Sequence, residues 1–373
     1  MGGDGPRGPT VDRGERAVSD SFRVALDGRG ADRGAEAIVG GARAAAAEGI
    51  GVRVFGDPAE LAALDDVPGV QVITAGEQIT NDEEPVAAVR SRPEASIVRV
   101  AADVAEGRAA ALVSAGSTGA AMTAALFALK RIQGVRRPAL AVQIVVPGRE
   151  GPPTLLLDAG ANSEARAGDL VQAAYLGTAF SEAVMGVRRP LVGLLSVGEE
   201  PAKGTPAVVE AHAALASAEG IVFRGNVEGG DLLAGIADVI VTDGFTGNVA
   251  LKTIEGTARA VAAAVGAAAR SGPRAGAGGL LLRPALGGLR RRLDPDTTGG
   301  AILLGLRGVA VIAHGSAGPE GIANAIRLAA RTVRERAVER TAASLERYGA
   351  TRGAMASAAA PGSGELARDR TVS

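Results

Sequence analysis

The chain has 373 residues, of which 47% are hydrophobic and 2% aromatic, and its formal net charge is -1. This composition is sufficient for a sizeable core in one or two domains, and the near-neutral charge argues against a general nucleic-acid-binding protein. The chain has no cysteine and only two histidines, which excludes disulfides, thiolate metal sites and cysteine nucleophiles and leaves too few histidines to build a metal site. We therefore expect neither a metal ion nor a cofactor.

The two ends of the chain differ in pattern from its middle. Residues 1–20 are polar and aperiodic and predict a disordered leader, and residues 349–373 predict a disordered tail. No apolar signal-peptide core and no apolar run long enough to span a membrane is present, so we expect a cytoplasmic location. Residues 21–348 are expected to form one domain.

Within this domain, β-branched runs alternate with alanine-rich helical segments. The first predicted strands lie at residues 22–27, 51–56 and 70–73, and the first predicted helices at residues 35–48, 58–64 and 85–106, the last broken near Pro93. Such alternation predicts an α/β fold with a mostly parallel sheet that is covered by helices on both faces.

Four later segments each run from an apolar strand through a glycine loop into a helix. Ligands of open α/β sheets bind at the carboxyl ends of strands, and a helix amino terminus favours anions, so we expect the four loops to converge on one phosphate site. In the last segment the helix is expected to start near Asn248. The candidate binding residues are Ser114, Gly116, Ser117, Thr118, Gly119, Asp158, Asn162, Asp243, Gly244, Thr246 and Gly247.

Lysine is rare in this chain, which uses arginine for almost every cation. Its three lysines are Lys130, Lys203 and Lys252, and the last two adjoin glycine loops. A compact, mobile ammonium suits a site in a way that a planar guanidinium does not. Lys252 either helps to hold phosphate or only pairs with Asp243.

A leucine- and arginine-rich segment, residues 280–293, follows a helix that is expected to end near residue 270 and a flexible stretch at residues 271–279. Leu282, Leu286 and Leu289 recur at helical spacing between arginines. This pattern is typical of a membrane-surface helix, but equally of a helix packed on another helix, as in a dimer. Pro284 weakens the helical pattern. A strand at residues 302–313 and a last helix reaching residue 348 complete the domain.

The chemistry open to these residues is limited. The sequence contains no serine nucleophile elbow, Walker lysine loop or metal motif, and His314 is either a base or a structural residue. Attack of bound phosphate on a thioester needs only positioning and polarisation of the carbonyl, because thiolate is a good leaving group. Lys203 and Asn248 are the candidate donors for that carbonyl. Asp158 and Asp243 either orient cations or cap turns.

Five blocks of the sequence together resemble PlsX, the bacterial phosphate acyltransferase family of phospholipid synthesis. They are residues 114–120, 157–162, 198–204, 241–253 and 299–316. The resemblance implies a Rossmann-like, doubly wound fold related to phosphotransacetylase and isopropylmalate dehydrogenase, with a protruding helical hairpin at about residues 249–297. It also implies catalysis by Lys203 and Asn248, and substrate contacts that include Asp27 and His314.

The resemblance further implies the reaction and its partners. Acyl-[acyl carrier protein] and inorganic phosphate would give acyl phosphate and free carrier protein, in a homodimer attached peripherally to the membrane through Leu282, Leu286 and Leu289. A glycerol-phosphate acyltransferase would take the product. The sequence departs from the family pattern in the first loop, at Gly28, Arg29, Ala31 and Ala35, and also at Ser117 and Thr298. Two alternatives are a phosphotransacetylase-like enzyme acting on acyl-CoA and a catalytically weak membrane scaffold.

Overall fold

The computed structural model describes residues 22–292 and 295–353. The expected leader, residues 1–20, and most of the expected tail lie outside the described residues. The tail prediction is wrong for residues 349–353, which belong to the folded domain. Ala350 is 2% exposed, and its carbonyl oxygen accepts a hydrogen bond from Nε2 of Gln172 at 2.8 Å.

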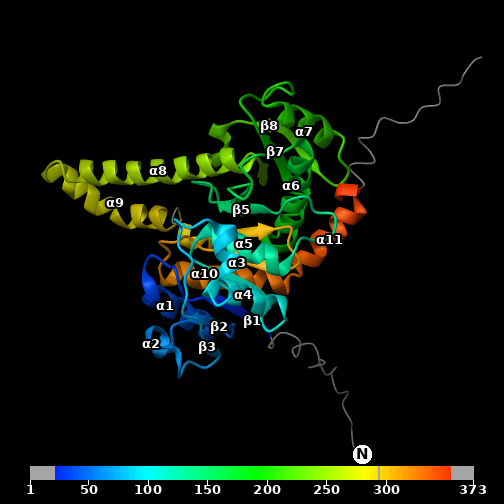
Figure 1. The fold of residues 1–373 in the computed structure, drawn as a ribbon. Coiled ribbons are helices and arrows are strands. Elements are labelled where there is room, and N and C mark those ends of the chain that lie inside the picture. The colour runs from blue at the N-terminus through cyan, green and yellow to red at the C-terminus, as the bar shows by residue number, and fades with distance from the viewer. Residues whose placement is uncertain (1–21, 293–294, 354–373) are drawn as a thin grey trace, which may run out of the picture.

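One mixed sheet of eleven strands crosses the whole domain, in the order β3-β2-β1-β4-β11-β10-β5-β6-β9-β7-β8 (Figure 1). Each half is parallel within itself, which confirms the prediction of a mostly parallel sheet, but β10 and β5 at its centre are antiparallel to their neighbours. The strands are β1 (Arg23–Asp27), β2 (Gly51–Gly56), β3 (Val70–Thr74), β4 (Ala111–Ser114), β5 (Ala139–Ile144), β6 (Thr154–Leu157), β7 (Leu191–Leu195), β8 (Val222–Val227), β9 (Val239–Val241), β10 (Ala301–Leu304) and β11 (Val309–Ile312).

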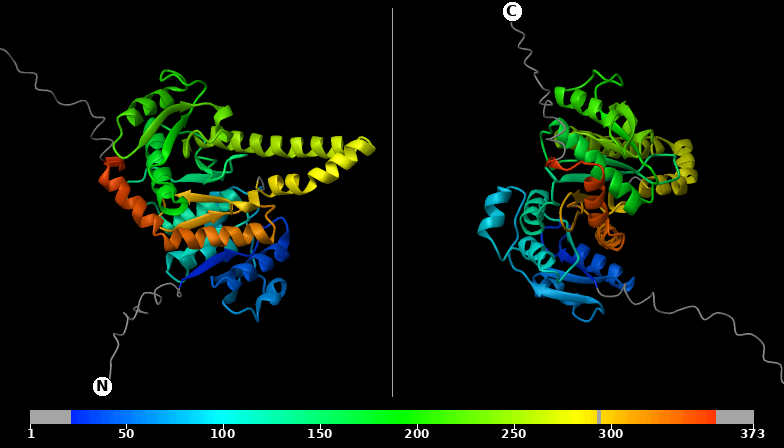
Figure 2. Two further views of the ribbon diagram at one scale, coloured as in Figure 1. Left: turned by 180° about the vertical axis from the view of Figure 1, so that it is seen from behind. Right: turned by 90° about the vertical axis from the view of Figure 1, so that its right-hand side faces the viewer.

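Helices cover both faces of this sheet (Figures 1 and 2). Because aromatics are scarce, neighbouring elements approach through small residues: a Cβ built on Gly41 of α1 would lie 2.4 Å from Cγ2 of Ile322 in α10. The predicted break near Pro93 separates α3 from α4. The helices are α1 (Gly34–Ala47), α2 (Pro58–Leu61), α3 (Pro85–Ser91), α4 (Ser96–Ala105), α5 (Thr118–Leu129), α6 (Ala167–Phe180), α7 (Pro206–Ala216), α8 (Gly244–Ala269), α9 (Pro273–Arg292), α10 (Pro319–Arg334) and α11 (Ala337–Arg347).

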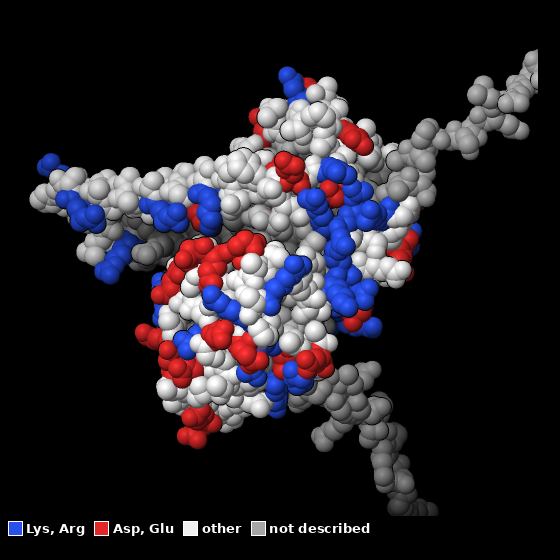
Figure 3. Space-filling view, viewed as in Figure 1, with Lys and Arg blue, Asp and Glu red and all other residues white. Residues whose placement is uncertain are grey.

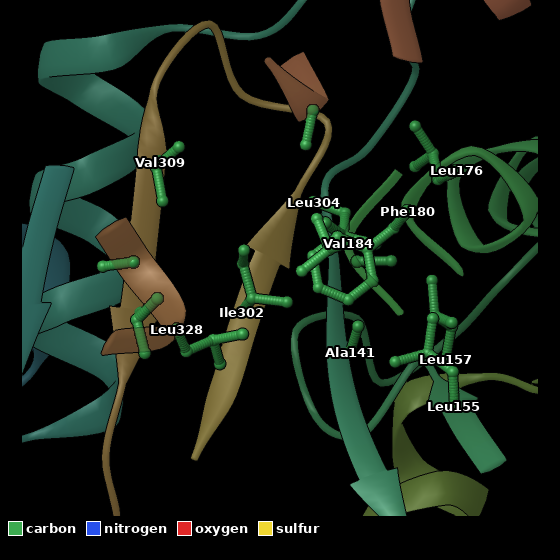
Figure 4. Close-up of a cluster of buried hydrophobic side chains, with 14 of the residues drawn as sticks. Ala141, Leu155, Leu157, Leu176, Phe180, Val184, Ile302, Leu304, Val309 and Leu328 are labelled. Carbon is green, nitrogen blue, oxygen red and sulfur yellow. The ribbon is translucent and has the colours of Figure 1, made fainter. Parts of the chain in front are cut away.

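A continuous aliphatic core joins the two halves of the sheet across its antiparallel centre. Figure 4 shows side chains of β5, β6, β10 and β11 meeting those of α6 and α10. Each fully buried leucine or phenylalanine of this kind stabilises the fold by about 1.5–3 kcal/mol. The labelled side chains, which are 0–7% exposed, are Ala141, Leu155, Leu157, Leu176, Phe180, Val184, Ile302, Leu304, Val309 and Leu328.

Helices α8 and α9 form the predicted hairpin, which projects from the body of the protein (Figures 1 and 2). Its helix bounds differ from expectation. Helix α8 begins at Gly244 rather than Asn248, because Asp243 is its N-cap, and α9 begins at Pro273, so residues 273–279 are helical rather than flexible. Pro284 lies inside α9 without ending it. None of the helices in the described residues is both long and apolar enough to cross a membrane.

Two further boundary predictions are wrong. Residues 302–313 are not one strand but the antiparallel pair β10 and β11, because the chain reverses at Gly305, which has a φ of 94°. The last helix is likewise two helices, α10 and α11, separated at Arg336, whose φ of 50° is left-handed and interrupts helical geometry.

Candidate active site

The glycine loops form two groups rather than one. In the sheet, Leu304 pairs with Ala139 and Ala141 pairs with Leu157, so β6, β9 and β7 run opposite to β1, β4 and β11. The carboxyl ends of the two halves therefore lie at opposite edges, and the expected convergence of all loops at one edge is wrong. The antiparallel strands β10 and β5 cause this reversal.

The first group centres on Asp27, which ends β1 and is 3% exposed. Its carboxylate accepts hydrogen bonds from the hydroxyls of Ser96 at 2.6 Å and Ser114 at 2.8 Å and from the backbone N–H of Arg29 at 3.2 Å. Burial raises the pKa of Asp27 to about 6, although these three donors and the nearby Arg29 charge lower it. Ser96 is a site residue that the sequence did not reveal.

The amino terminus of α5 lies beside this carboxylate. A Cβ built on Gly116 would be 3.3 Å from Oδ2 of Asp27, and one on Gly30, whose φ is 88°, would be 2.9 Å from Cα of Gly116, so only glycines allow the two loops to meet. Ser117 is the N-cap of α5, and its hydroxyl accepts a long hydrogen bond of 3.5 Å from Ala120 N–H. No hydrogen bond occupies the N–H groups of Thr118 and Gly119 within the described structure, which suits an anion there.

His314 follows β11 at the same edge of the sheet. Its Nδ1 accepts a hydrogen bond from the backbone N–H of Ser316 at 3.2 Å and lies 2.8 Å from that residue's hydroxyl. The loop is tied to the first one, because Asp32 N–H donates to the carbonyl oxygen of Gly315 at 2.9 Å. His314 is exposed, so Nε2 stays open toward solvent.

The second group is built around Asp158, which follows β6 and is 4% exposed. Its carboxylate accepts so many backbone hydrogen bonds that it organises the loop rather than orienting a cation. The amide of Asn162 donates to this carboxylate and to the carbonyl oxygen of Pro138, at 2.7 Å each. The backbone donors to Asp158 are Leu140 at 3.1 Å, Gly160 at 3.0 Å, Ala161 at 2.8 Å and Asn162 at 2.8 Å.

Helix α8 starts directly on this loop. Gly244 N–H donates to the carbonyl oxygen of Asn162 at 2.7 Å, and Asp243 accepts from the N–H of Thr246 at 2.8 Å and its hydroxyl at 2.7 Å. Gly247 N–H donates to the carbonyl oxygen of Asp243 at 2.9 Å. These N–H groups already have partners, so the expected anion site on them is not formed, and Asp243 caps the helix rather than orienting a cation.

Asn248 lies in the second turn of α8 and faces the Asp158 loop. A Cβ built on Gly160 would lie 3.8 Å from Cβ and Cγ of Asn248, which places the amide group over that glycine. The side chain is exposed, and no described group forms a hydrogen bond with its amide. This amide is therefore available to a substrate.

Lys203 lies in the loop after β7, the strand next to β9 in the sheet. The loop is fixed by hydrogen bonds from Ser196 Oγ to the carbonyl oxygen of Lys203 at 2.9 Å and from Lys203 N–H to that of Glu200 at 3.0 Å. Lys203 and Asn248 therefore follow neighbouring parallel strands at the same edge. Lys252 pairs with Glu255 at 3.0 Å rather than with Asp243.

The polar groups that both groups of loops leave open to a substrate are mainly hydrogen-bond donors. In the part of the chain that the structure describes, no cluster of three acidic or histidine side chains could hold a metal ion. Backbone N–H groups, an exposed ammonium and an exposed amide suit anionic oxygens and a polarised carbonyl. The arrangement can therefore support transfer chemistry that depends on positioning and electrostatics.

Solved structures share the fold of this chain. A phosphotransacetylase from Streptococcus pyogenes matches with a TM-score of 0.56 at 18% identity, covering 85% of this chain and 94% of that one. A branched-chain phosphotransacylase from Enterococcus faecalis V583 matches with a TM-score of 0.53 at 17% identity, covering 84% and 99%. The chain thus has the fold of the phosphotransacetylases.

Sequence comparison then gives the family. The chain belongs to the fatty acid synthesis protein family, whose model matches residues 22–340. A phosphate acyltransferase of Thermus thermophilus is 47% identical over 311 residues, covering 82% of this chain and 93% of the relative. One of Elusimicrobium minutum is 44% identical over 319 residues, covering 84% and 92%. The chain is accordingly a transferase of the phosphate acyltransferase type.

Proposed function

We propose that this enzyme transfers the acyl group of acyl-[acyl carrier protein] to inorganic phosphate. A phosphate oxygen attacks the thioester carbonyl carbon, the carbon–sulfur bond breaks, and the carrier leaves as thiolate, which takes a proton from solvent. The observation that carries this proposal is the placement of Asn248 over Gly160, with its amide open, at the same sheet edge as Lys203. Both side chains can donate to a carbonyl oxygen that becomes negative in the transition state.

The phosphate itself would be held at the amino terminus of α5. Thr118 and Gly119 offer free N–H groups there, and Ser117 offers a hydroxyl. The proposal needs the two groups of loops to act together; Ala161 of the second group packs against the apolar cluster to which Ala120 and Ala121 of this helix belong. The phosphate site would be shaped by Asp27, Ser114, Gly116 and His314. The loop and helix start that position Asn248 at the thioester carbonyl would be formed by Asp158, Asn162, Asp243, Gly244, Thr246 and Gly247.

The test is release of free carrier protein from long-chain acyl-[acyl carrier protein] with and without phosphate. Release only when phosphate is present supports the proposal, and release without phosphate contradicts it. Better turnover of acetyl-CoA would favour the phosphotransacetylase-like alternative. Absence of turnover together with vesicle binding would favour the membrane scaffold.

The hairpin supports a second part of the proposal, peripheral attachment to the membrane. In the half of α9 toward the hairpin tip, three leucines are largely exposed: Leu280 at 67%, Leu281 at 83% and Leu282 at 57%. Adjacent exposed leucines of this size suit the boundary between lipid headgroups and acyl chains. The side chains of Leu286 and Leu289, which were assigned the same role, lie outside the described residues. Such attachment in the cytoplasm would bring acyl phosphate to a membrane glycerol-phosphate acyltransferase.

A homodimer completes the proposal, and it rests on the resemblance to the PlsX family. Multi-angle light scattering of the purified protein gives its mass directly. About twice the 37.0 kDa of the chain supports the dimer, and the mass of one chain contradicts it.

A further inference from the structure

Four cations lie together where α5 ends and where β10 turns into β11. We call Lys130, Arg131, Arg137 and Arg307 the basic patch; all four side chains are exposed. The two segments are joined by hydrogen bonds from Arg307 to the carbonyl oxygens of Lys130, through its N–H at 2.9 Å, and Arg131, through Nε at 3.0 Å. The chain therefore holds these charges close to one another despite their distance in sequence.

The positive charge of the basic patch is not offset by neighbouring carboxylates, because its guanidinium groups donate hydrogen bonds to neutral carbonyl oxygens. Nη1 of Arg131 donates to the carbonyl oxygen of Arg136, and Nη1 of Arg137 donates to that of Glu164 at 3.1 Å. No carboxylate of the described chain forms an ion pair with the patch, whereas the adjacent Arg136 pairs with Asp169 at 2.7 Å. The arginines are thus held in place without being neutralised.

This patch adjoins the Asp158 loop of the candidate active site through Arg137. Arg137 is followed by Pro138, whose carbonyl oxygen accepts the amide of Asn162 at 2.7 Å, and Leu140 N–H donates to Asp158 at 3.1 Å. A protein bound on the patch would therefore lie beside the loop over which Asn248 is placed.

The patch lies on the opposite side of the molecule from the hairpin tip. Arg352 N–H donates to the carbonyl oxygen of Gly134 at 2.8 Å, so the patch loop lies next to the carboxyl-terminal end of the described chain, which Figures 1 and 2 show away from α9. Figure 3 shows Lys and Arg gathered in a band on this side of the molecule. A partner on the patch would not compete with a membrane at the hairpin.

We propose that the basic patch is the docking surface for an acidic carrier protein, which presents its acyl thioester to the adjacent site; this rests on the function proposed above. With a net charge of -1, the whole chain does not attract a polyanion, so a local patch must supply the steering. Complementary charge of this kind sets the encounter rate and orientation of a partner more than the chemistry that follows.

The test compares two substrates with the same reacting bond, acyl-[acyl carrier protein] and acyl-pantetheine, which lacks the carrier. An Arg131→Glu/Arg307→Glu variant should raise KM for the carrier substrate at least tenfold, with kcat and all constants for acyl-pantetheine unchanged. The matched control is Arg23→Glu/Arg43→Glu, whose exposed arginines also bond to neutral oxygens, Gln71 Oε1 and the carbonyl oxygen of Ala63. This control should leave KM and kcat unchanged for both substrates.

Three outcomes would overturn the docking proposal: an unchanged KM for the carrier substrate, an equal rise for acyl-pantetheine, or the same effect in the control. A Lys130→Glu/Arg137→Glu variant provides a second measurement should the first variant not fold. In the wild type, raising NaCl from about 0.05 to 0.5 M should raise KM for the carrier substrate alone, because salt screens exposed charges. A salt-independent KM would contradict docking through this patch.

Binding of unacylated carrier protein, measured by calorimetry, separates this proposal from the proposed function. If the wild type turns over neither substrate with phosphate, the function fails, yet carrier binding weakened at least tenfold only in the patch variants still supports docking. Loss of binding to anionic lipid vesicles with unchanged carrier binding would instead assign the patch to a membrane and overturn the proposal.

Discussion

Gly247 of α8 lies so close to Asp158 that a Cβ built on the glycine would be 1.9 Å from the aspartate's carbonyl oxygen. The same loop and helix meet again at Gly244, where a Cβ would be 2.5 Å from the carbonyl oxygen of Asn162. Backbone cannot retreat from such a contact as a flexible side chain can. These two glycines therefore set the position of α8, and with it the position of Asn248.

Substitution Gly247→Ala should destabilise the fold by about 3 kcal/mol or more and lower kcat/KM more than tenfold, because the added methyl forces α8 off the loop. Urea unfolding and steady-state kinetics measure the two effects. Gly256→Ala is the matched control in the same helix, where a Cβ would meet nothing within 4 Å; it should stabilise by up to about 1 kcal/mol. Equal behaviour of the two variants would contradict the close approach.

Replacement of the proposed carbonyl donors should reduce catalysis without unfolding the protein. Lys203→Met and Asn248→Leu should each lower kcat/KM at least tenfold, about 1.4 kcal/mol of barrier, because each removes a donor from the developing oxyanion. If both act on one oxygen, the double variant should lose less than the sum of the single losses. Turnover that is unchanged in either single variant would remove that residue from the mechanism.

Lys252→Met is the comparison for these variants. The ammonium of Lys252 is exposed and pairs with Glu255, so its loss should change stability by less than about 1 kcal/mol and leave kcat within about twofold. Phosphate titration of the variant decides between pairing and phosphate binding. A several-fold rise in KM for phosphate would place Lys252 in the phosphate site after all.

The buried carboxyl group of Asp27 should make stability depend on pH. Its pKa is about 6 in the fold against an ordinary value of 3.8, so between these values the folded state binds more protons than the unfolded state. The free energy of unfolding therefore falls as pH rises through this window, by about 3 kcal/mol in total. Asp27→Asn removes the titration, so urea unfolding at about pH 4 and about pH 7 should show the wild type losing most of this free energy relative to the variant. Parallel pH profiles would contradict the raised pKa.

The hairpin tip should be required for membrane binding but not for chemistry. Changing Leu280, Leu281 and Leu282 to Asp should abolish sedimentation with anionic vesicles and leave turnover measured without membranes within about twofold, because charged side chains do not enter the interface. Val86→Asp, at an exposed position in the first turn of α3, is the control that should keep vesicle binding. Loss of both properties in the hairpin variant would indicate damage to folding or assembly instead.

Local sequence signals predicted the elements well, but not how distant elements meet. Alternating strand and helix patterns identified most strands near their observed bounds, and Pro93 marked a real break. The reversal of the sheet could not be predicted, because it depends on β5, a strand that no glycine loop and helix follow, and on the pairing of Ala141 with Leu157. As a result the loops were expected at one edge of the sheet.

The site shows the same limit. The glycine loops and the lysine usage pointed to Lys203 and Asn248, but nothing in the sequence shows that Ser96 donates to Asp27, 69 residues away. Asp158 and Asp243 were equally compatible with capping and with cation binding. Only the hydrogen bonds that they accept from backbone N–H groups identify them as organisers of the loop and the helix.

The most direct test of the central claim follows radiolabelled inorganic phosphate into product during turnover of long-chain acyl-[acyl carrier protein]. If phosphate attacks the thioester, each carrier protein released should yield one labelled acyl phosphate, and hydroxylamine added after turnover should return that label as inorganic phosphate while it converts the acyl group to the acyl hydroxamate. Carrier release and labelled acyl phosphate should fall together in Lys203→Met. Release of carrier protein together with free fatty acid, without label in an acyl phosphate, would contradict the account.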